Sequence, residues 1–190
     1  MRLKPFHNQR GQTIIEVMAA IFVITIGMMG ALALTVSNLR NQRIGAGRLV
    51  STQLSREGIE SVRAMRDTNW LQEETWDNGL TSPTSHCAVL DASGKSLTFQ
   101  TCGTVTDAVY QLSRDPATGV YNPTSGDPTR YFRRLTLHPI CLNGTTETVA
   151  TSGTCGSDES IGLEVTSETA WNDVVSVHTA TVVEKIYNWR

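Results

Sequence analysis

Residues Gly11 to Val36 read GQTIIEVMAAIFVITIGMMGALALTV, an apolar run that contains one charged residue, Glu16. The part from Val17 to Val36 is about 20 residues long, and at ~1.5 Å per residue a helix of that length covers ~30 Å, the hydrocarbon thickness of a bilayer. A charged side chain at mid-bilayer costs ~2.5 kcal/mol or more, so Glu16 needs a reason to be there. The run predicts a membrane-spanning helix with one functional acid.

The residues before this run complete a known signal. Gly11 ends a short leader with three basic residues and no acid: Arg2, Lys4 and Arg10. Glu16 stands at the fifth position after the glycine. The arrangement resembles the prepilin signal of type IV pilins and type II secretion pseudopilins. The resemblance implies a cut by prepilin peptidase between Gly11 and Gln12, N-methylation of Gln12, and a role for Glu16 in filament assembly. Family members usually begin with phenylalanine, and Gln12 bears on methylation more than on cleavage.

Two ordinary explanations compete for the same residues. A secretory signal peptide also has a basic start, but its apolar region is usually ~7–15 residues long and leads to a small-residue cleavage site. A plain membrane anchor explains the span and leaves Glu16 without a reason. Basic residues lie near both ends of the span, so charge alone does not orient it. The resemblance and the cysteines place the N-terminus in the cytoplasm.

A second helical pattern follows the apolar run. From Ser37 to Trp70 there is no proline, and apolar residues recur near helical spacing: Leu39, Ala46, Val50, Leu54, Val62 and Met65. Arginines and glutamates, Arg66 among them, occupy the other faces. We expect an amphipathic helix whose apolar stripe covers its own sheet, with a groove for a foreign helix as the alternative. Four glycines mark places for bending, or in the membrane part for close helix packing: Gly27, Gly30, Gly45 and Gly47.

The remainder predicts short strands separated by turns, hence an α+β, pilin-like fold in which a long N-terminal helix packs on a small antiparallel β-sheet. Expected strands are 87–90 and 96–102, which form a hairpin, then 109–112, 131–139, 161–166 and 173–187. Expected loops are 67–83, with Trp70 and Trp76 folding back on the domain, and 115–128. Trp171-Asn172-Asp173 is expected to turn into the last strand, where Val175, Val177, Thr179, Thr181 and Val183 share a face. Residues 131–190 also resemble, more loosely, the tails of minor pilins and pseudopilins.

These features divide the chain into four expected segments: a prepilin leader over 1–11, a transmembrane and filament-core helix over 12–36, its amphipathic continuation over 37–70, and an exported β-rich head over 71–190. Net charge is -2 for the whole chain. Removing the leader lowers the basic residues from 16 to 13 against 18 acids, a net charge of -5. No basic stripe points to direct nucleic-acid binding.

The four cysteines, Cys87, Cys102, Cys141 and Cys155, all lie in the expected head. Three connectivities are possible, and sequence proximity favours Cys87–Cys102 and Cys141–Cys155. Disulfides persist in an oxidising compartment, which agrees with export. Zinc is the rival interpretation, using His86, Cys87, Cys102, His138 and Cys141, but the spacing lacks C-x2-C or H-x3-H. The acidic turns at Asp91 and Asp158 lack the ligand spacing of a calcium loop. No cofactor and no metal are expected.

No catalytic motif surrounds any histidine or cysteine in the sequence. We therefore expect the protein to have an assembly role and not to be an enzyme. The expected function is that of a structural subunit, a minor pilin or pseudopilin of a type IV pilus-like or type II secretion filament. Its expected partners are other pilin or pseudopilin subunits, prepilin peptidase, the inner-membrane assembly machinery and membrane lipid. The alternatives are a membrane-anchored binding domain that never enters a filament and, more distantly, a secreted hydrolase.

Overall fold

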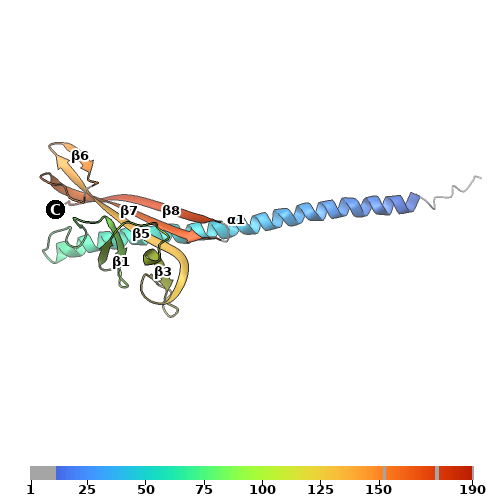
Figure 1. The fold of residues 1–190 in the computed structure, drawn as a ribbon, viewed down its shortest axis with the longest axis horizontal. Helices are drawn as coiled ribbons and strands as arrows, with labels where there is room; N and C mark the ends of the chain where they lie inside the picture. Colours follow the sequence, from blue (N-terminus) through green and yellow to red (C-terminus); the bar gives the residue numbers. More distant parts are fainter. Residues whose placement is uncertain (1–11, 152, 174–175, 190) are drawn as a thin grey trace, which may run out of the picture. The chain divides into compact units, whose positions relative to one another are not determined.

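A computed structural model of the chain describes residues 12–151, 153–173 and 176–189. In this described part, one long helix, α1 (Gln12–Leu71), precedes a sheet and a short 3₁₀ turn, η1 (Ala108–Tyr110) (Figure 1). The strands are β1 (Cys87–Leu90), β2 (Leu97–Gln100), β3 (Gln111–Arg114), β4 (Tyr121–Asn122), β5 (Asp127–Asn143), β6 (Thr146–Val149), β7 (Glu159–Asn172) and β8 (Val177–Tyr187). The chain divides into two compact units, residues 1–45 and residues 46–190, with the boundary inside α1.

The sheet is antiparallel and is organised around the long strand β5. One edge of β5 pairs with β7, which pairs in turn with β8. The other edge pairs with β3, β1 and β6 in succession along its length. β2 extends the sheet beyond β1, and β4 extends it beyond β3. β8 therefore forms one long edge, while three short strands share the opposite side of β5.

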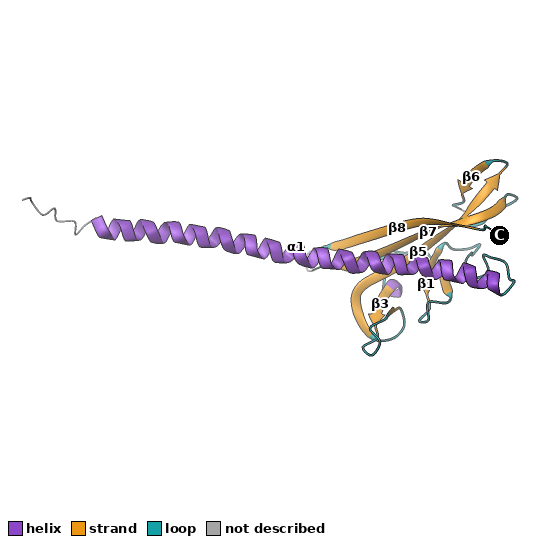
Figure 2. Cartoon of the chain, turned by 180° about the vertical axis from the view of Figure 1, so that it is seen from behind, coloured by secondary structure: helices purple, strands orange, loops and turns teal. Residues whose placement is uncertain are grey.

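The part of α1 from Ala46 onward buries one face against this sheet, and β5, β7 and β8 run alongside it (Figure 2). Buried residues recur every three or four positions: Gly47, Ser51, Leu54, Ser55, Gly58, Ile59, Val62, Met65, Arg66 and Asn69. The predicted α+β fold, with a long N-terminal helix packed on an antiparallel sheet, is confirmed. The predicted stripe is confirmed from Val50 to Met65, whereas Leu39 and Ala46 are exposed.

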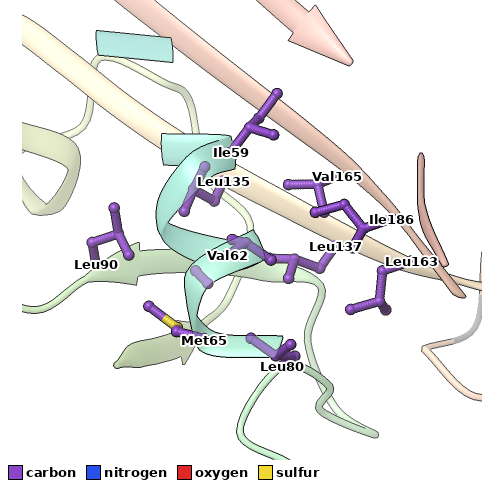
Figure 3. Packing of buried hydrophobic residues seen from close by; sticks show 11 residues of the cluster. Ile59, Val62, Met65, Leu80, Leu90, Leu135, Leu137, Leu163, Val165 and Ile186 are labelled. Carbon is purple, nitrogen blue, oxygen red and sulfur yellow. The ribbon is translucent and has the colours of Figure 1, made fainter. Parts of the chain in front are cut away.

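The main core lies between the last turns of α1 and the sheet (Figure 3). Ile59, Val62 and Met65 come from the helix and meet side chains from β1, β5, β7, β8 and the loop after the helix: Leu80, Ala88, Leu90, Leu135, Leu137, Leu163, Val165 and Ile186. Alternate residues of β5 and β7 point toward the helix because successive side chains of a strand face opposite sides. On the other face, Phe132 and Ala170 pack under Tyr110 of η1 and under Val105, which precedes η1.

Small residues let α1 approach the sheet closely. A Cβ added to Gly58 would lie 2.8 Å from Ser167 Oγ and 2.9 Å from Leu135 Cδ2, closer than real side chains come. A Cβ on Gly47 would collide with the indole of Trp171. Gly47 is therefore a packing position and not the predicted bend. Gly27, Gly30 and Gly45 have nothing within 4 Å of such a Cβ.

Several polar side chains in this contact are paired, whereas Ser167 Oγ beside Gly58 is buried without a hydrogen-bond partner among the residues that the structure describes. Ser51 Oγ donates to the Thr169 carbonyl at 3.1 Å, and Ser55 Oγ donates to Thr169 Oγ1 at 2.8 Å. Arg133, 4% exposed, donates to the Leu54 carbonyl at 3.1 Å and lies 3.5 Å from Glu57. Burial lowers the pKa of the Arg133 guanidinium below its ordinary value, and Glu57 opposes that shift.

Arg66 corrects the sequence prediction, which placed it on a polar face. Its side chain is 7% exposed, and its guanidinium lies 4.6 Å from the ring of Trp70 and 6.0 Å from that of Trp189. It also donates to the Tyr187 carbonyl at 3.1 Å and to Asp67. Arg66 therefore joins the end of α1 to the end of β8 through stacking and hydrogen bonds.

Several predicted boundaries were wrong. The loop expected from Asp67 begins after Leu71, because no glycine or proline stops the helix and Asn69 is buried on the helix face. Trp171 belongs to β7, opposite His178, and not to a turn. Val109 lies in η1, and β3 begins at Gln111. The loop expected over 115–128 contains β4 and the start of β5.

Two further differences concern the last strands. A hairpin, β5–β6, follows the strand expected over 131–139, and Asn143 pairs with Thr146 across Gly144, whose φ is +62°, and Thr145. Glycine at the first of two central turn residues is a known hairpin signal, so the signal was present and missed. In β8 the shared face of Val177, Thr179, Thr181 and Val183 is exposed, because it points away from α1. Val175 lies outside the described residues.

Both disulfides join neighbours in sequence. Cys87 bonds Cys102 and Cys141 bonds Cys155, with Cα–Cα separations of 5.1 Å and 5.4 Å. These are the pairs that sequence proximity favours. Each closes a loop of 15 or 14 residues, which contributes about 3 kcal/mol in the chain-entropy account.

We expect a non-reducing peptide map of the native protein to recover these two crosslinks and no free thiol. Trypsin separates Cys87 from Cys102 at Lys95, and a glutamate-specific protease separates Cys141 from Cys155 at Glu147. Replacing Cys141 and Cys155 together by serine should lower the free energy of unfolding by about 3 kcal/mol. A crosslink between Cys87 and Cys141 would contradict the assignment.

Candidate functional site

The described part of the N-terminal unit up to Val36 presents an apolar surface on all sides. From Ile14 to Arg43 every described side chain is exposed, including large apolar residues such as Ile15 at 72% and Met29 at 71%. A helix that is apolar all round is stable in a membrane or inside a helix bundle, not in water. This helix is long and apolar enough to cross a bilayer.

Glu16 lies at the start of this surface. It is the only charged residue between Gly11 and Arg40. Its side chain is exposed, and within the described residues no ion pair involves it. It lies in the second turn of α1, whose N-terminus favours negative charge. A carboxylate here is available to a cationic group brought by another molecule.

The predicted cleavage point falls at the edge of the structure. α1 begins at Gln12, and Gly11 and the leader lie outside the described residues. The position of the cut between Gly11 and Gln12 therefore stays a prediction. A chain that began at Gln12 would carry its α-amine at the first residue of the helix, four positions before Glu16.

Comparison with known proteins identifies this segment. Residues 6–32 match the family model described as the prokaryotic N-terminal methylation motif. Comparisons with curated proteins and with solved structures gave no match. The matched signal, the apolar helix and the antiparallel sheet fit a type IV pilin-like protein. The signal and the apolar helix also fit anchoring in the inner membrane.

The residues of the alternative zinc set do not come together as ligands. Cys87, Cys102 and Cys141 are consumed in disulfides, so they supply no thiolate. His86 and His138 do meet, with ring centroids 4.6 Å apart. His138 Nδ1 donates to the Ala150 carbonyl at 3.1 Å, which ties β5 to the loop after β6.

The contact between His86 and His138 predicts that the protein becomes less stable as pH falls. Burial, with a smaller contribution from His86, lowers the pKa of His138 below 6.5. As pH falls below 6.5 the unfolded chain takes up a proton that the folded chain resists, so stability decreases. Chemical unfolding of the full chain in detergent, at about pH 7.5 and about pH 5.5, should show this loss. His138→Gln should reduce the difference and His178→Gln should keep it. An equal difference in wild type and His138→Gln would contradict the assignment.

The two acidic turns are satisfied by the protein itself. Asp91 accepts hydrogen bonds from Ser93 Oγ at 2.6 Å and from the backbone amides of Lys95 and Ser96 at 2.8 Å and 3.2 Å. Partial burial raises the pKa of Asp91, but these hydrogen bonds outweigh it and the net shift is downward. Asp158 accepts from Asn143 Nδ2 at 3.3 Å. Asp91 is thus a turn-forming residue.

A groove of about 670 Å³ opens between the end of α1 and the β1–β2 turn. Its lining includes Met65, Thr68, Asn69, Gln72, Lys95 and Leu97. Asn69 Nδ2 is already committed to the carbonyls of Trp76 and Asn78, at 3.0 Å and 2.9 Å. Among the lining residues in the described part of the chain, Lys95 carries the one charged side chain.

Proposed function

We propose that this protein is a structural subunit, a minor pilin or pseudopilin, of a type IV pilus-like or type II secretion filament. The observation that carries the proposal is the lone exposed carboxylate of Glu16 at the start of a helix that is apolar on all sides. Packing such helices together would bury that surface. A buried carboxylate without a partner is strongly disfavoured, and a neighbouring subunit can supply that partner.

In this proposal prepilin peptidase cuts between Gly11 and Gln12, and the new amine of a neighbouring subunit meets Glu16. Desolvation of both groups offsets much of their attraction, so the pair contributes register more than stability. The inner-membrane assembly machinery moves the subunit from lipid into the filament. The N-terminus faces the cytoplasm and the head lies outside, which agrees with the two disulfides.

Two features favour a minor subunit over an abundant one. Gln12 replaces the phenylalanine usual at the first position of the family, and no proline occurs between Pro5 and Pro83 to kink the helix. The role is assembly, in keeping with a pilin-like family.

The test compares Glu16→Ala and Glu16→Gln with the wild type. Both variants should lose the leader and insert in the membrane normally, because the span becomes less polar. The share of each variant in sheared filaments, relative to its amount in membranes, should fall about tenfold or more, which corresponds to ~1.4 kcal/mol. Glu16→Gln keeps size and hydrogen bonding, so it isolates the charge. If both variants enter filaments as the wild type does, the chain is a plain membrane-anchored domain.

A further inference from the structure

Basic residues follow the apolar run without any acid to balance them. Between Val17 and Arg56 the charged residues are all arginines: Arg40, Arg43, Arg48 and Arg56. Arg40 and Arg43 belong to the same unit as the apolar run. With the N-terminus in the cytoplasm these arginines lie on the outer side of the membrane, against the usual bias of basic residues toward the cytoplasm. We therefore expect a negatively charged partner to compensate the positive charge of these arginines.

Their distance from the apolar run sets what they can reach. Arg40 lies ~6 Å and Arg43 ~10 Å beyond Val36 along the helix axis. A bilayer is ~40–45 Å thick with its headgroups and ~30 Å without them, so each headgroup layer is roughly 5–8 Å deep. Glu16 and Arg40 are ~36 Å apart along the helix, so with Glu16 near one headgroup layer Arg40 reaches the other. The guanidinium of Arg40 thus falls at the depth of lipid phosphates. The backbone of Arg43 lies just beyond that depth, and its long side chain reaches back toward it, because helical side chains tilt toward the N-terminus.

The side chains are free to make that contact. Both are exposed, and within the described residues neither has an ion pair. By contrast, Arg63 pairs with Glu60 and Glu184, and Arg134 pairs with Glu168 at 2.7 Å. Guanidinium binds phosphate through two parallel hydrogen bonds, a geometry that lysine cannot reproduce.

We propose that Arg40 and Arg43 bind the phosphates of anionic lipid headgroups on the outer side of the membrane and thereby fix the depth of the helix in the bilayer. The inference rests on the membrane anchoring and orientation in the proposed function, and not on entry into a filament. The same contacts must be broken when a subunit leaves the membrane, so they also set a threshold for extraction.

The experiment is native mass spectrometry of the full-length protein in detergent with equal amounts of phosphatidylglycerol and phosphatidylcholine. The wild type should retain phosphatidylglycerol preferentially. In the double variant Arg40→Gln/Arg43→Gln, the ratio of bound phosphatidylglycerol to bound phosphatidylcholine should fall about fivefold for each arginine removed. In Arg40→Lys/Arg43→Lys this ratio should lie between those of the wild type and the double glutamine variant. Arg56→Gln is the matched control, because Arg56 is also exposed on α1 but belongs to the other unit, and it should behave as the wild type does.

Two outcomes would overturn the inference: a wild type without preference between the two lipids, or a double glutamine variant that keeps the wild-type preference. Loss of the variant from filaments with unchanged lipid retention would also overturn it, because the arginines would then serve a neighbouring protein. The lipid measurement involves no filament, so its failure is distinct from a failure of Glu16→Ala to block assembly.

Discussion

A chain carrying Gly11→Leu is expected to keep its leader in cells that contain a working prepilin peptidase. A peptidase site that accepts glycine beside the scissile bond has no room for a branched four-carbon side chain, so the cut should be lost almost completely. Intact-mass analysis of the purified protein reads the outcome directly. The wild type should begin at Gln12, with or without a methyl group, and the variant at Met1.

Gly30→Leu is the matched control for this substitution. It makes the same chemical change within the apolar helix, where a Cβ has nothing within 4 Å. It should be processed as the wild type is. A Gly11→Leu chain that begins at Gln12 would show that the cut does not depend on this glycine, and a wild type that begins at Met1 would remove the basis of the proposed processing.

The second large effect is expected at Gly58, inside the contact between α1 and the sheet. Leucine there would force its side chain against Ser167 and Leu135, where even a Cβ comes within 2.9 Å. Overpacking of this kind costs ~1–3 kcal/mol or more, which predicts a fall in the melting temperature of roughly 5–10 °C. Circular dichroism of the full chain in detergent measures it.

Gly45→Leu separates crowding from helix propensity. Gly45 is also helical but has nothing within 4 Å of an added Cβ. Replacing an exposed helical glycine recovers up to ~1 kcal/mol of helix propensity, so this variant should be as stable as the wild type or slightly more so. If Gly58→Leu and Gly45→Leu have the same melting temperature, the helix does not pack on the sheet as closely as described.

Local signals predicted much of this fold. β1 has the predicted bounds of Cys87 to Leu90, and the hairpin that follows it was expected from the turn at Asp91 to Lys95. The family match over residues 6–32 agrees with the signal inferred from Gly11 and Glu16. These features depend on residues close in sequence, where spacing and turn chemistry are sufficient.

The misses depend on contacts between distant residues. Arg66 was expected on a polar face, and only the fold shows that it lies against the rings of two tryptophans. The fold also shows that Arg133 reaches a helix carbonyl. Trp171 looked like a turn residue, yet it fills the space that Gly47 leaves open. Burial of this kind is decided by how β5, β7 and β8 pair and pack on α1, which local patterns do not encode.

The polar contacts between α1 and the last strands have a mechanical consequence. Ser51 and Ser55 bond Thr169, Arg63 pairs with Glu184, and Arg66 bonds the Tyr187 carbonyl. They follow one another along the helix, so a pull on α1 along its axis would load them together in shear instead of peeling them one by one. The tension would pass from α1 directly into β7 and β8. The hairpin β1–β2 takes no part in these polar contacts, and Ala88 and Leu90 of β1 contact the helix through the apolar core.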